Sequence, residues 1–248
     1  MAKDLFSQQA NLYARYRPTY PPELFNYIFS FVNQKNTAWD CATGNGQAAS
    51  VLADHFQTVE ATDISEAQLK NATQKDNIHY QTCPAERTPF VDNCFDLITI
   101  ATAYHWFNCK AFYQEATRVS KNNCVVAAWA YHVFYSRDEN ITAIIRNFYY
   151  NIINSYWDPE RKYVDDRYTT AVFDFDLLPS KDFDLVLHWK KEDFLGYLST
   201  WSAVQHYKKQ VGQSPLSLIE ADVSKVWPGN EEKEFHFPLF LRIGRVIK

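Results

Sequence analysis

The chain of 248 residues is long enough for one large α/β domain, or for one domain with an embedded cap. Its net charge of −4 gives no overall attraction to nucleic acid, which disfavours an RNA or DNA substrate without excluding a local basic patch. Its 5 cysteines form no Cys-x-x-Cys pair, and neither a signal-peptide core nor a membrane-length apolar run occurs, so we expect a cytoplasmic protein without disulfides, a metal site or membrane contact.

Residues 1–36 are predicted to form a polar, aromatic arm followed by a helix that begins at Pro22. Tyr16 and Arg17 belong to this arm, and both residue types can contact a carboxylate. One interpretation is a flap that folds over a binding site. The other is an arm that lies on the surface without contacting a ligand.

Residues 37–130 are predicted to form a cofactor-binding core that opens with a strand, a glycine turn and a helix. Gly44 and Gly46 allow a sharp turn and the close approach of a ligand to the backbone. Many nucleotide-binding sheets share this construction, so the glycines alone are a weak signal. Asp40 is more informative, because a carboxylate before the turn is a poor neighbour for a pyrophosphate and favours a ligand with a cationic head.

The second predicted strand, residues 58–63, ends in an acid. Asp63 follows Gly46 by 17 residues, near the spacing of about 20 at which a carboxylate meets ribose hydroxyls in such folds. A carboxylate can accept two hydrogen bonds from a diol. The alternative is a helix cap, because a new helix begins at Ser65.

Further strands are predicted at 78–82, 95–101 and 123–129, with helices between them. This alternation indicates a doubly wound, mostly parallel sheet, in which ligands bind beyond the carboxyl ends of the strands. The glycine turn, Asp63, the loop at Glu86, and His105 would all lie at that edge.

Residues 131–182 interrupt the alternation and are predicted to form a helical cap insertion over the pocket. Residues 183–248 supply C-terminal helices and two late strands that pair as an antiparallel edge. The frequent aromatics, 17% of the chain, fit either a bulky core or an aromatic substrate pocket, and the core is the commoner use of any single ring. We therefore expect a single domain over 1–248.

The pattern Asp40-x-x-x-Gly44-x-Gly46 resembles motif I of the Rossmann-like, class I S-adenosylmethionine-dependent methyltransferases. The resemblance is closest to the small-molecule branch of trans-aconitate methyltransferase-like and type 11 proteins. It implies a seven-stranded α/β sheet with an antiparallel C-terminal edge strand. It also implies that the cofactor is S-adenosylmethionine, that the product is S-adenosylhomocysteine, and that the cofactor contacts come from Asp40, Ala42, Gly44, Gly46, Asp63, Ile64, Ala85, Glu86 and Ala101.

Methyl transfer from a sulfonium is an in-line displacement, so the protein mainly aligns the two reactants and excludes water. A carboxylate acceptor is already ionised and needs no base, but it needs partners. The candidates are Arg17 first, then Tyr16, Arg146, Arg161 and Lys162.

A hydroxyl or amine acceptor would benefit from a base, and His105 is the best placed by sequence. The alternative is a histidine that packs beside Trp106 for structural reasons. Trp106 itself could face the methyl site or the core, and it joins Tyr16 and Arg17 as a substrate-binding candidate.

Other functions remain open from the sequence. A macromolecular methyltransferase, acting on RNA or protein, and an inactive S-adenosylmethionine-binding protein share the same motif. A nicotinamide dehydrogenase would also use Gly44-x-Gly46-x-x-Ala49, but Asp40 and the Ala85-Glu86 loop oppose it, and no Tyr-x-x-x-Lys pair occurs. The methyl acceptor and the oligomeric state are not determined by the sequence.

Overall fold

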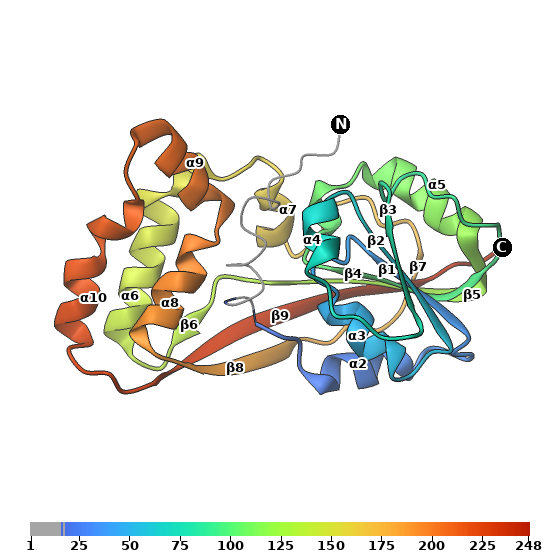
Figure 1. The fold of residues 1–248 in the computed structure, drawn as a ribbon, viewed down its shortest axis with the longest axis horizontal. Helices are drawn as coiled ribbons and strands as arrows, with labels where there is room; N and C mark the ends of the chain where they lie inside the picture. The colour runs from blue at the N-terminus through green and yellow to red at the C-terminus, as the bar shows by residue number, and fades with distance from the viewer. Residues whose placement is uncertain (1–15, 17) are drawn as a thin grey trace.

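The computed structural model describes residue 16 and residues 18–248. Figure 1 shows two lobes side by side, a sheet flanked by helices and a lobe of helices, with long strands running between them. Most of the predicted N-terminal arm, including Arg17, lies outside the described residues. In the described part of the chain, no helix combines the length and the apolar character needed to cross a membrane.

The first half of the chain forms the parallel part of the sheet, in the order β3-β2-β1-β4-β5. Its strands are β1 (Thr37–Cys41), β2 (Thr58–Asp63), β3 (Ile78–Thr82), β4 (Phe95–Ala101) and β5 (Ser120–Tyr131). Every residue of β4 except Ala101 is buried, because helices or chain segments cover both faces of a central strand. The predicted doubly wound, mostly parallel sheet is confirmed.

The helices of this lobe begin where the sequence supplies a cap. The side chain of Ser65 accepts a hydrogen bond from the N–H of Gln68, and that of Asn108 accepts one from Ala111. Each cap fixes the residue at which its helix begins. The capped helices follow the loops after β2 and β4. The helices are α2 (Pro22–Phe29), α3 (Gln47–Ala53), α4 (Glu66–Lys70) and α5 (Cys109–Val119), with a short 3-10 turn, η2 (Tyr104–Trp106).

The antiparallel part of the sheet is built on β9 (Lys233–Arg245), which pairs with β5 and places Trp129 opposite Leu241. The strand β8 (Phe183–Trp189) pairs with β9 on its other side, as the sequence predicts. The described chain has nine strands in this sheet instead of seven. The two additional strands, β6 (Tyr135–Ser136) and β7 (Asp176–Leu177), have only two residues each and therefore carry no periodic signal.

The helical lobe, called the cap below, covers the far end of β8 and β9 (Figure 1). Residues 131–182 contribute α6 (Glu139–Asn147), a π-helical turn η3 (Phe148–Ile152) and η4 (Asn154–Tyr156). The short helix α7 (Arg161–Asp165) follows them and packs against η2 beside the sheet (Figure 1). The C-terminal segment adds α8 (Lys191–Ser199), α9 (Ser202–Val211), η5 (Pro215–Leu218) and α10 (Glu220–Val226). The cap is thus made by two segments of the chain.

Aromatic packing joins the cap to the sheet. The rings of Phe134 and Phe237 stack at 4.7 Å, and Trp201 of the cap packs 6.0 Å from Phe134. These residues belong to one hydrophobic cluster that continues under the parallel strands. On the opposite face, Tyr168 and Phe173 pack around Tyr104 in a second cluster. Most of the aromatic residues of the chain therefore pack in its hydrophobic core.

Candidate active site

The glycine turn after β1 is the centre of the predicted cofactor site. Gly44 and Gly46 have φ angles of +57° and +79°, the left-handed region that glycine adopts without steric cost. A Cβ on Gly46 would overlap the hydroxyl of Tyr80, whereas a Cβ on Gly44 would meet no atom within 4 Å. Gly46 is therefore required by packing, and Gly44 leaves open space in which a ligand can approach the backbone.

Asp40 lies beneath this turn and is fully buried. Its Oδ2 accepts hydrogen bonds from Thr43 Oγ1 at 2.5 Å and from the N–H of Ala49 at 3.0 Å, and its Oδ1 accepts one from Thr99 Oγ1 at 2.8 Å. Burial raises the pKa of Asp40 to about 6, so the carboxylate is ionised at neutral pH. Asp40 ties the turn to α3 and β4 and places a negative charge beneath the open face of the turn.

Asp63 ends β2 next to the same turn. Its Oδ2 accepts a hydrogen bond from the N–H of Gly44 at 2.8 Å, and its Oδ1 accepts one from the N–H of Ser65 at 2.8 Å. The carboxylate thus joins the glycine turn to the start of α4. Ile64, which follows, is 36% exposed. The sequence suggests two roles for Asp63, to bind a ligand or to start a helix. A residue in this position can have both roles.

The remaining predicted cofactor residues lie along the same edge. Ala85 is buried, and Glu86 accepts a hydrogen bond from the N–H of Asn108 at 2.9 Å, which joins the loop after β3 to the start of α5. Ala42 and Thr102 directly follow the adjacent strands β1 and β4, and both have positive φ angles, 56° and 57°. Such strained backbone in non-glycine residues concentrates at functional sites. Ala101 ends β4 immediately before Thr102.

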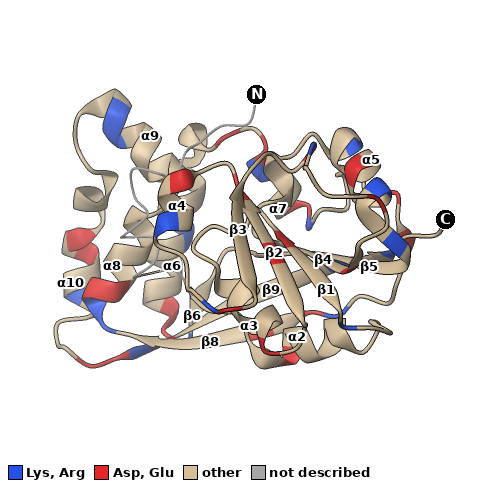
Figure 2. Cartoon of the chain, turned by 45° about the vertical axis from the view of Figure 1, so that its right-hand side comes forward, with Lys and Arg blue, Asp and Glu red and all other residues tan. Residues whose placement is uncertain are grey.

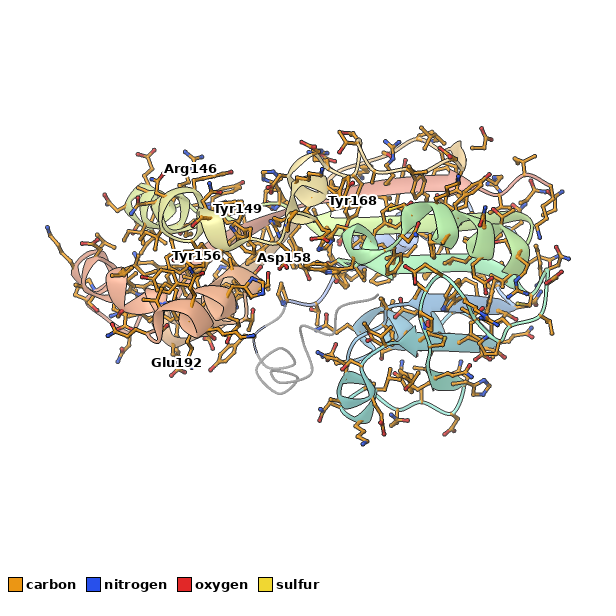
Figure 3. The ribbon with its side chains drawn as sticks, turned by 90° about the horizontal axis from the view of Figure 1, so that it is seen from above. Arg146, Tyr149, Tyr156, Asp158, Tyr168 and Glu192 are labelled. Carbon is orange, nitrogen blue, oxygen red and sulfur yellow. The ribbon has the colours of Figure 1, made fainter. Side chains whose placement is uncertain are left out.

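A pocket lies between the end of β4 and the cap. Thr102, His105 and Trp106 line it from the sheet side. Figure 3 shows Tyr149, Tyr156 and Asp158 on the cap side of the boundary between the lobes and Tyr168 on the side of the sheet. The pocket is also lined by cap residues, by Arg161 at the start of α7, and by residues at the end of β5 and just after it: Tyr149, Trp157, Asp158, Tyr197, Trp201 and Ser202, and Tyr131, His132, Val133 and Phe134.

The structure places both His105 and Trp106 at this pocket. His105 is 6% exposed, and its Nδ1 lies 3.1 Å from the hydroxyl of Tyr168. Its ring lies 4.6 Å from that of Trp106. His105 therefore lines the pocket, and its role as a base for a hydroxyl or amine acceptor stays a prediction.

Arg161, the first residue of α7, supplies a cation at the pocket. Its Nε donates to the hydroxyl of Tyr149 at 2.8 Å, and that hydroxyl donates to Asp165 at 2.9 Å. Burial raises the pKa of Tyr149 well above its usual value, so the hydroxyl keeps its proton. The guanidinium also lies 5.0 Å from the ring of Trp157. Among the described residues, no hydrogen bond involves Nη1 or Nη2 of Arg161, so these nitrogens can receive an anion.

The described part of the N-terminal arm runs between the cap and the sheet edge. Tyr16 packs so closely on Gly196 of α8 that a Cβ there would overlap its ring. Pro18 accepts a hydrogen bond from the hydroxyl of Tyr131 at 3.0 Å, and the hydroxyl of Tyr20 lies 3.0 Å from Thr102 Oγ1. Tyr16 thus lies beside the pocket residue Tyr197, and its binding role stays a prediction.

The other cations considered from the sequence lie elsewhere. Arg146 faces the outer side of the cap (Figure 3) and lines a separate groove, and Lys162 is exposed next to Tyr163. Sequence reasoning missed Tyr149, Trp157 and Trp201 as pocket residues. In the sequence, these residues are marked only by the high aromatic content of their segments. That content does not distinguish a pocket residue from a core residue.

In the part of the chain that the structure describes, His, Cys, Asp and Glu side chains do not gather in groups of three or more that could hold a metal ion.

Comparisons with known proteins agree with this geometry. The methyltransferase domain family, type 11, matches residues 39–128. The chain is 30% identical to a Dictyostelium discoideum protein named as a methyltransferase, over 98% of this chain and 95% of that one. It also resembles a solved structure from Anaeromyxobacter dehalogenans described as a type II methyltransferase, with 32% identity, a TM-score of 0.85, and coverage of 93% and 98% of the two chains.

A structure from Bacillus halodurans described as a methyltransferase shares the fold at 20% identity and a TM-score of 0.55, covering 92% of this chain and all of that one. The narrower resemblance to trans-aconitate methyltransferase-like proteins stays a prediction. The family decides against the dehydrogenase alternative and identifies S-adenosylmethionine as the cofactor. The open face of Gly44 and the buried negative charge of Asp40 fit a cationic nucleoside ligand at this edge. The chain belongs to the class I S-adenosylmethionine-dependent methyltransferases.

Proposed function

We propose that the protein methylates a small molecule that carries a carboxylate and binds in the pocket between the sheet edge and the cap. The observation that carries this proposal is Arg161, whose guanidinium lines the pocket. The Nε of Arg161 donates a hydrogen bond to Tyr149, and the side chain of Arg161 remains 21% exposed. A guanidinium binds a carboxylate with paired, charge-assisted hydrogen bonds, which are stronger than hydrogen bonds between neutral groups.

The lining of the pocket supports a small molecule. The walls are largely aromatic, and Trp106, Trp157 and Trp201 contribute the largest rings. Aromatic walls that also carry polar side chains can bind and orient a small ligand.

The distribution of charge gives no comparable support for nucleic acid. Figure 2 shows Lys and Arg interspersed with Asp and Glu over the helices and loops in view. Binding to a phosphate backbone favours a basic face that carries mostly one sign of charge. A macromolecular acceptor is therefore the alternative that an experiment should test, rather than the preferred one.

The bound cofactor supplies an activated methyl group on a cationic sulfur, so the chain has little bond chemistry to perform. Asp40 and Asp63 hold the turn at the cofactor edge. The pocket residues orient the acceptor and keep water away, which accounts for most of the acceleration in a displacement of this kind. The proposal needs no additional catalytic group when the acceptor is a carboxylate, and His105 is the candidate base when it is a hydroxyl or amine.

The test uses S-adenosylmethionine with a tritiated methyl group, a panel of small organic acids and their amides, and separate RNA and protein fractions. Transfer to an acid, absent from the Asp63→Ala variant, would support the proposal. Transfer only to RNA or protein would contradict it in favour of a macromolecular acceptor. Binding of S-adenosylhomocysteine without transfer to any fraction would indicate the inactive binding protein.

A further inference from the structure

The side chain of Tyr168 meets His105 at the wall of the pocket. The Tyr168 hydroxyl lies 3.1 Å from Nδ1 of His105, and both side chains are buried. The rings of Tyr104 and Phe240 pack edge-on against that of Tyr168, at 5.4 Å and 5.1 Å, and hold it in place. His105 belongs to η2, which closely follows the end of β4, so its ring joins the core to the pocket.

The backbone that carries Tyr168 is strained. Arg167 and Tyr168 have φ angles of 56° and 58°, a region that is unfavourable for residues other than glycine. The N–H of Tyr168 donates to the carbonyl of Tyr163 at 2.7 Å, which turns the chain back after α7, and α7 packs against η2. Strain of this kind concentrates at functional sites. Here it accompanies a fully buried phenol that faces the imidazole of His105 beside the sheet (Figure 3).

The hydroxyl of Tyr168 is the donor in this hydrogen bond. Burial raises the pKa of Tyr168 well above its usual value, and the charge of Arg161 only partly offsets this effect, so the phenol keeps its proton. Among the described residues, Nδ1 of His105 is the only acceptor with which this hydroxyl forms a hydrogen bond. A proton on Nδ1 would leave the buried phenol proton without an acceptor, which is unfavourable. Nδ1 therefore carries a lone pair and no proton.

We infer that Tyr168 is a positioning residue that fixes the neutral ring of His105 with its proton on Nε2, so that His105 binds the acceptor as a hydrogen-bond donor and not as a base. The hydrogen bond at one ring nitrogen determines which form the other nitrogen takes. Nε2 lies on the edge of the ring that points away from Tyr168, and His105 lines the pocket. The inference rests on the proposed function, because the group that receives this hydrogen bond is the acceptor carboxylate.

A donor at this position suits an anionic acceptor. The Nε2–H binds one oxygen of the carboxylate and leaves the other oxygen to be aligned with the methyl group. The second oxygen forms a bond to the methyl carbon as the carbon–sulfur bond breaks, and the electron pair of that bond stays on sulfur. No proton is lost. A hydroxyl or an amine has to lose a proton when it is methylated, and His105 in this form has no free lone pair to take it.

The form of the ring is measured by nitrogen NMR on protein with isotope-labelled histidines, at an alkaline pH at which an imidazole is neutral. The spectrum of His105→Gln identifies the signals of His105 among those of the 7 histidines. In the wild type we expect a protonated Nε2 and an unprotonated Nδ1. A proton on Nδ1 would overturn the inference, and this result does not depend on whether any variant of Tyr168 folds.

The positioning role of Tyr168 is tested in the same spectrum. Tyr168→Phe keeps the ring and removes the donor, so we expect signals that are averaged between the two neutral forms of His105. Tyr104→Phe is the matched control, because it removes a neighbouring buried hydroxyl that donates to the carbonyl of Val172 instead. It should leave the signals of His105 unchanged. Signals that are the same in Tyr168→Phe and the wild type would contradict the positioning role.

The donor role is tested with two substitutions of His105. Glutamine can donate from near the position of Nε2 but cannot take a proton, and alanine can do neither. The protein is saturated with S-adenosylhomocysteine, and the binding of cinnamate and mesaconate, each compared with its amide, is measured from the quenching of tryptophan fluorescence. We expect His105→Ala to weaken the binding of the acids at least about tenfold, and His105→Gln by less than about threefold.

Methyl transfer to an acid should follow the same order, with His105→Gln clearly more active than His105→Ala. If His105→Gln binds the acids like the wild type and yet is as inactive as His105→Ala, the ring acts as a base and the inference is wrong, although the proposed function stands. If no acid binds or is methylated while S-adenosylhomocysteine binds, the proposed function itself is wrong.

Discussion

The hydroxyl of Tyr80 occupies the space that a side chain on Gly46 would need. The same hydroxyl donates to the backbone carbonyl of Thr73 at 2.5 Å, so it cannot move away freely. We expect Gly46→Ala to lower the free energy of unfolding through this overlap, and by about 1–2 kcal/mol more because of the positive φ angle. Urea denaturation measures the change.

Gly44→Ala is the control, because it carries the same kind of backbone strain without the overlap. We expect a smaller loss of stability there, together with a loss of cofactor affinity, since the new methyl group enters the open face of the turn. Tyr80→Phe should restore part of the stability of Gly46→Ala. Equal destabilisation by both glycine variants would argue against the Tyr80 contact.

Asp63→Ala should weaken the binding of S-adenosylmethionine and of S-adenosylhomocysteine to the same extent. The change removes the carboxylate that accepts from Gly44 and Ser65, so the glycine turn loses one of its attachments to β2 and keeps only the backbone hydrogen bond from Thr43 to Thr62. We expect an affinity loss of at least about tenfold, because a half-buried hydrogen-bonding group is left without its charged partner. Titration calorimetry measures both ligands. Glu66→Ala removes an exposed carboxylate from the adjacent helix and should leave both affinities unchanged.

Asp40→Asn should make the protein relatively more stable as the pH rises. Because burial raises the pKa of Asp40 from 3.8 to about 6, its contribution to folding is favourable at low pH and is lost as the pH rises through about 6. The difference in pKa corresponds to roughly 3 kcal/mol, so the variant should gain on the wild type by up to about that amount between pH 4 and pH 8. A difference in the free energy of unfolding between Asp40→Asn and the wild type that is the same at all pH values would contradict this.

The same variant should discriminate between the two forms of the cofactor. S-adenosylmethionine carries a positive sulfonium that S-adenosylhomocysteine lacks, so the loss of the buried negative charge should weaken the first by about tenfold more than the second. Asp96→Asn is the control, since Asp96 is also buried but pairs with Lys121 at the opposite end of β4. An equal effect of Asp40→Asn on both ligands would mean that its role is purely structural.

His236 should stabilise the pairing of β8 with β9 in a pH-dependent manner. Its hydrogen bond with Asp184, at 2.5 Å, and then its hydrogen bond with Glu234, at 2.8 Å, raise the pKa of His236 above 6.5. The stabilisation is therefore complete below pH 6.5 and is lost as the pH rises through the higher pKa of the folded state. His236→Gln should be less stable than the wild type at pH 6, and the difference should shrink at alkaline pH. A thermal melt at each pH value tests this.

Gly196→Ala should report whether Tyr16 takes part in the site. Alanine favours the helix α8 by about 1 kcal/mol over glycine, but its methyl group would displace the ring of Tyr16. If Tyr16 contacts the acceptor, KM for the acid acceptor should rise while the melting temperature changes little. Tyr16→Ala should have the same effect, and the double variant should be no worse. An unchanged KM in all three variants would indicate that this segment lies on the surface without contacting the acceptor.

The sequence was sufficient to predict the parallel core because its signals are local. Strands at 58–63, 78–82 and 95–101 were predicted with the bounds that the structure has. Asp40, Gly44 and Asp63 could be assigned to one edge, because parallel strands place all their carboxyl ends on the same side. The helix-starting residue Ser65 was also readable, since a capping side chain acts within its own turn.

Only the tertiary structure decided which residues form the acceptor pocket. Tyr149 and Trp201 come from segments that are 52 residues apart and have the same helical spacing as core aromatics. Arg161 and Arg146 are equally charged in the sequence, yet the turn after η4 brings only Arg161 to the pocket. Local patterns determine which face of an element is buried, but the partner of that face depends on contacts between distant segments, which the order of residues does not display.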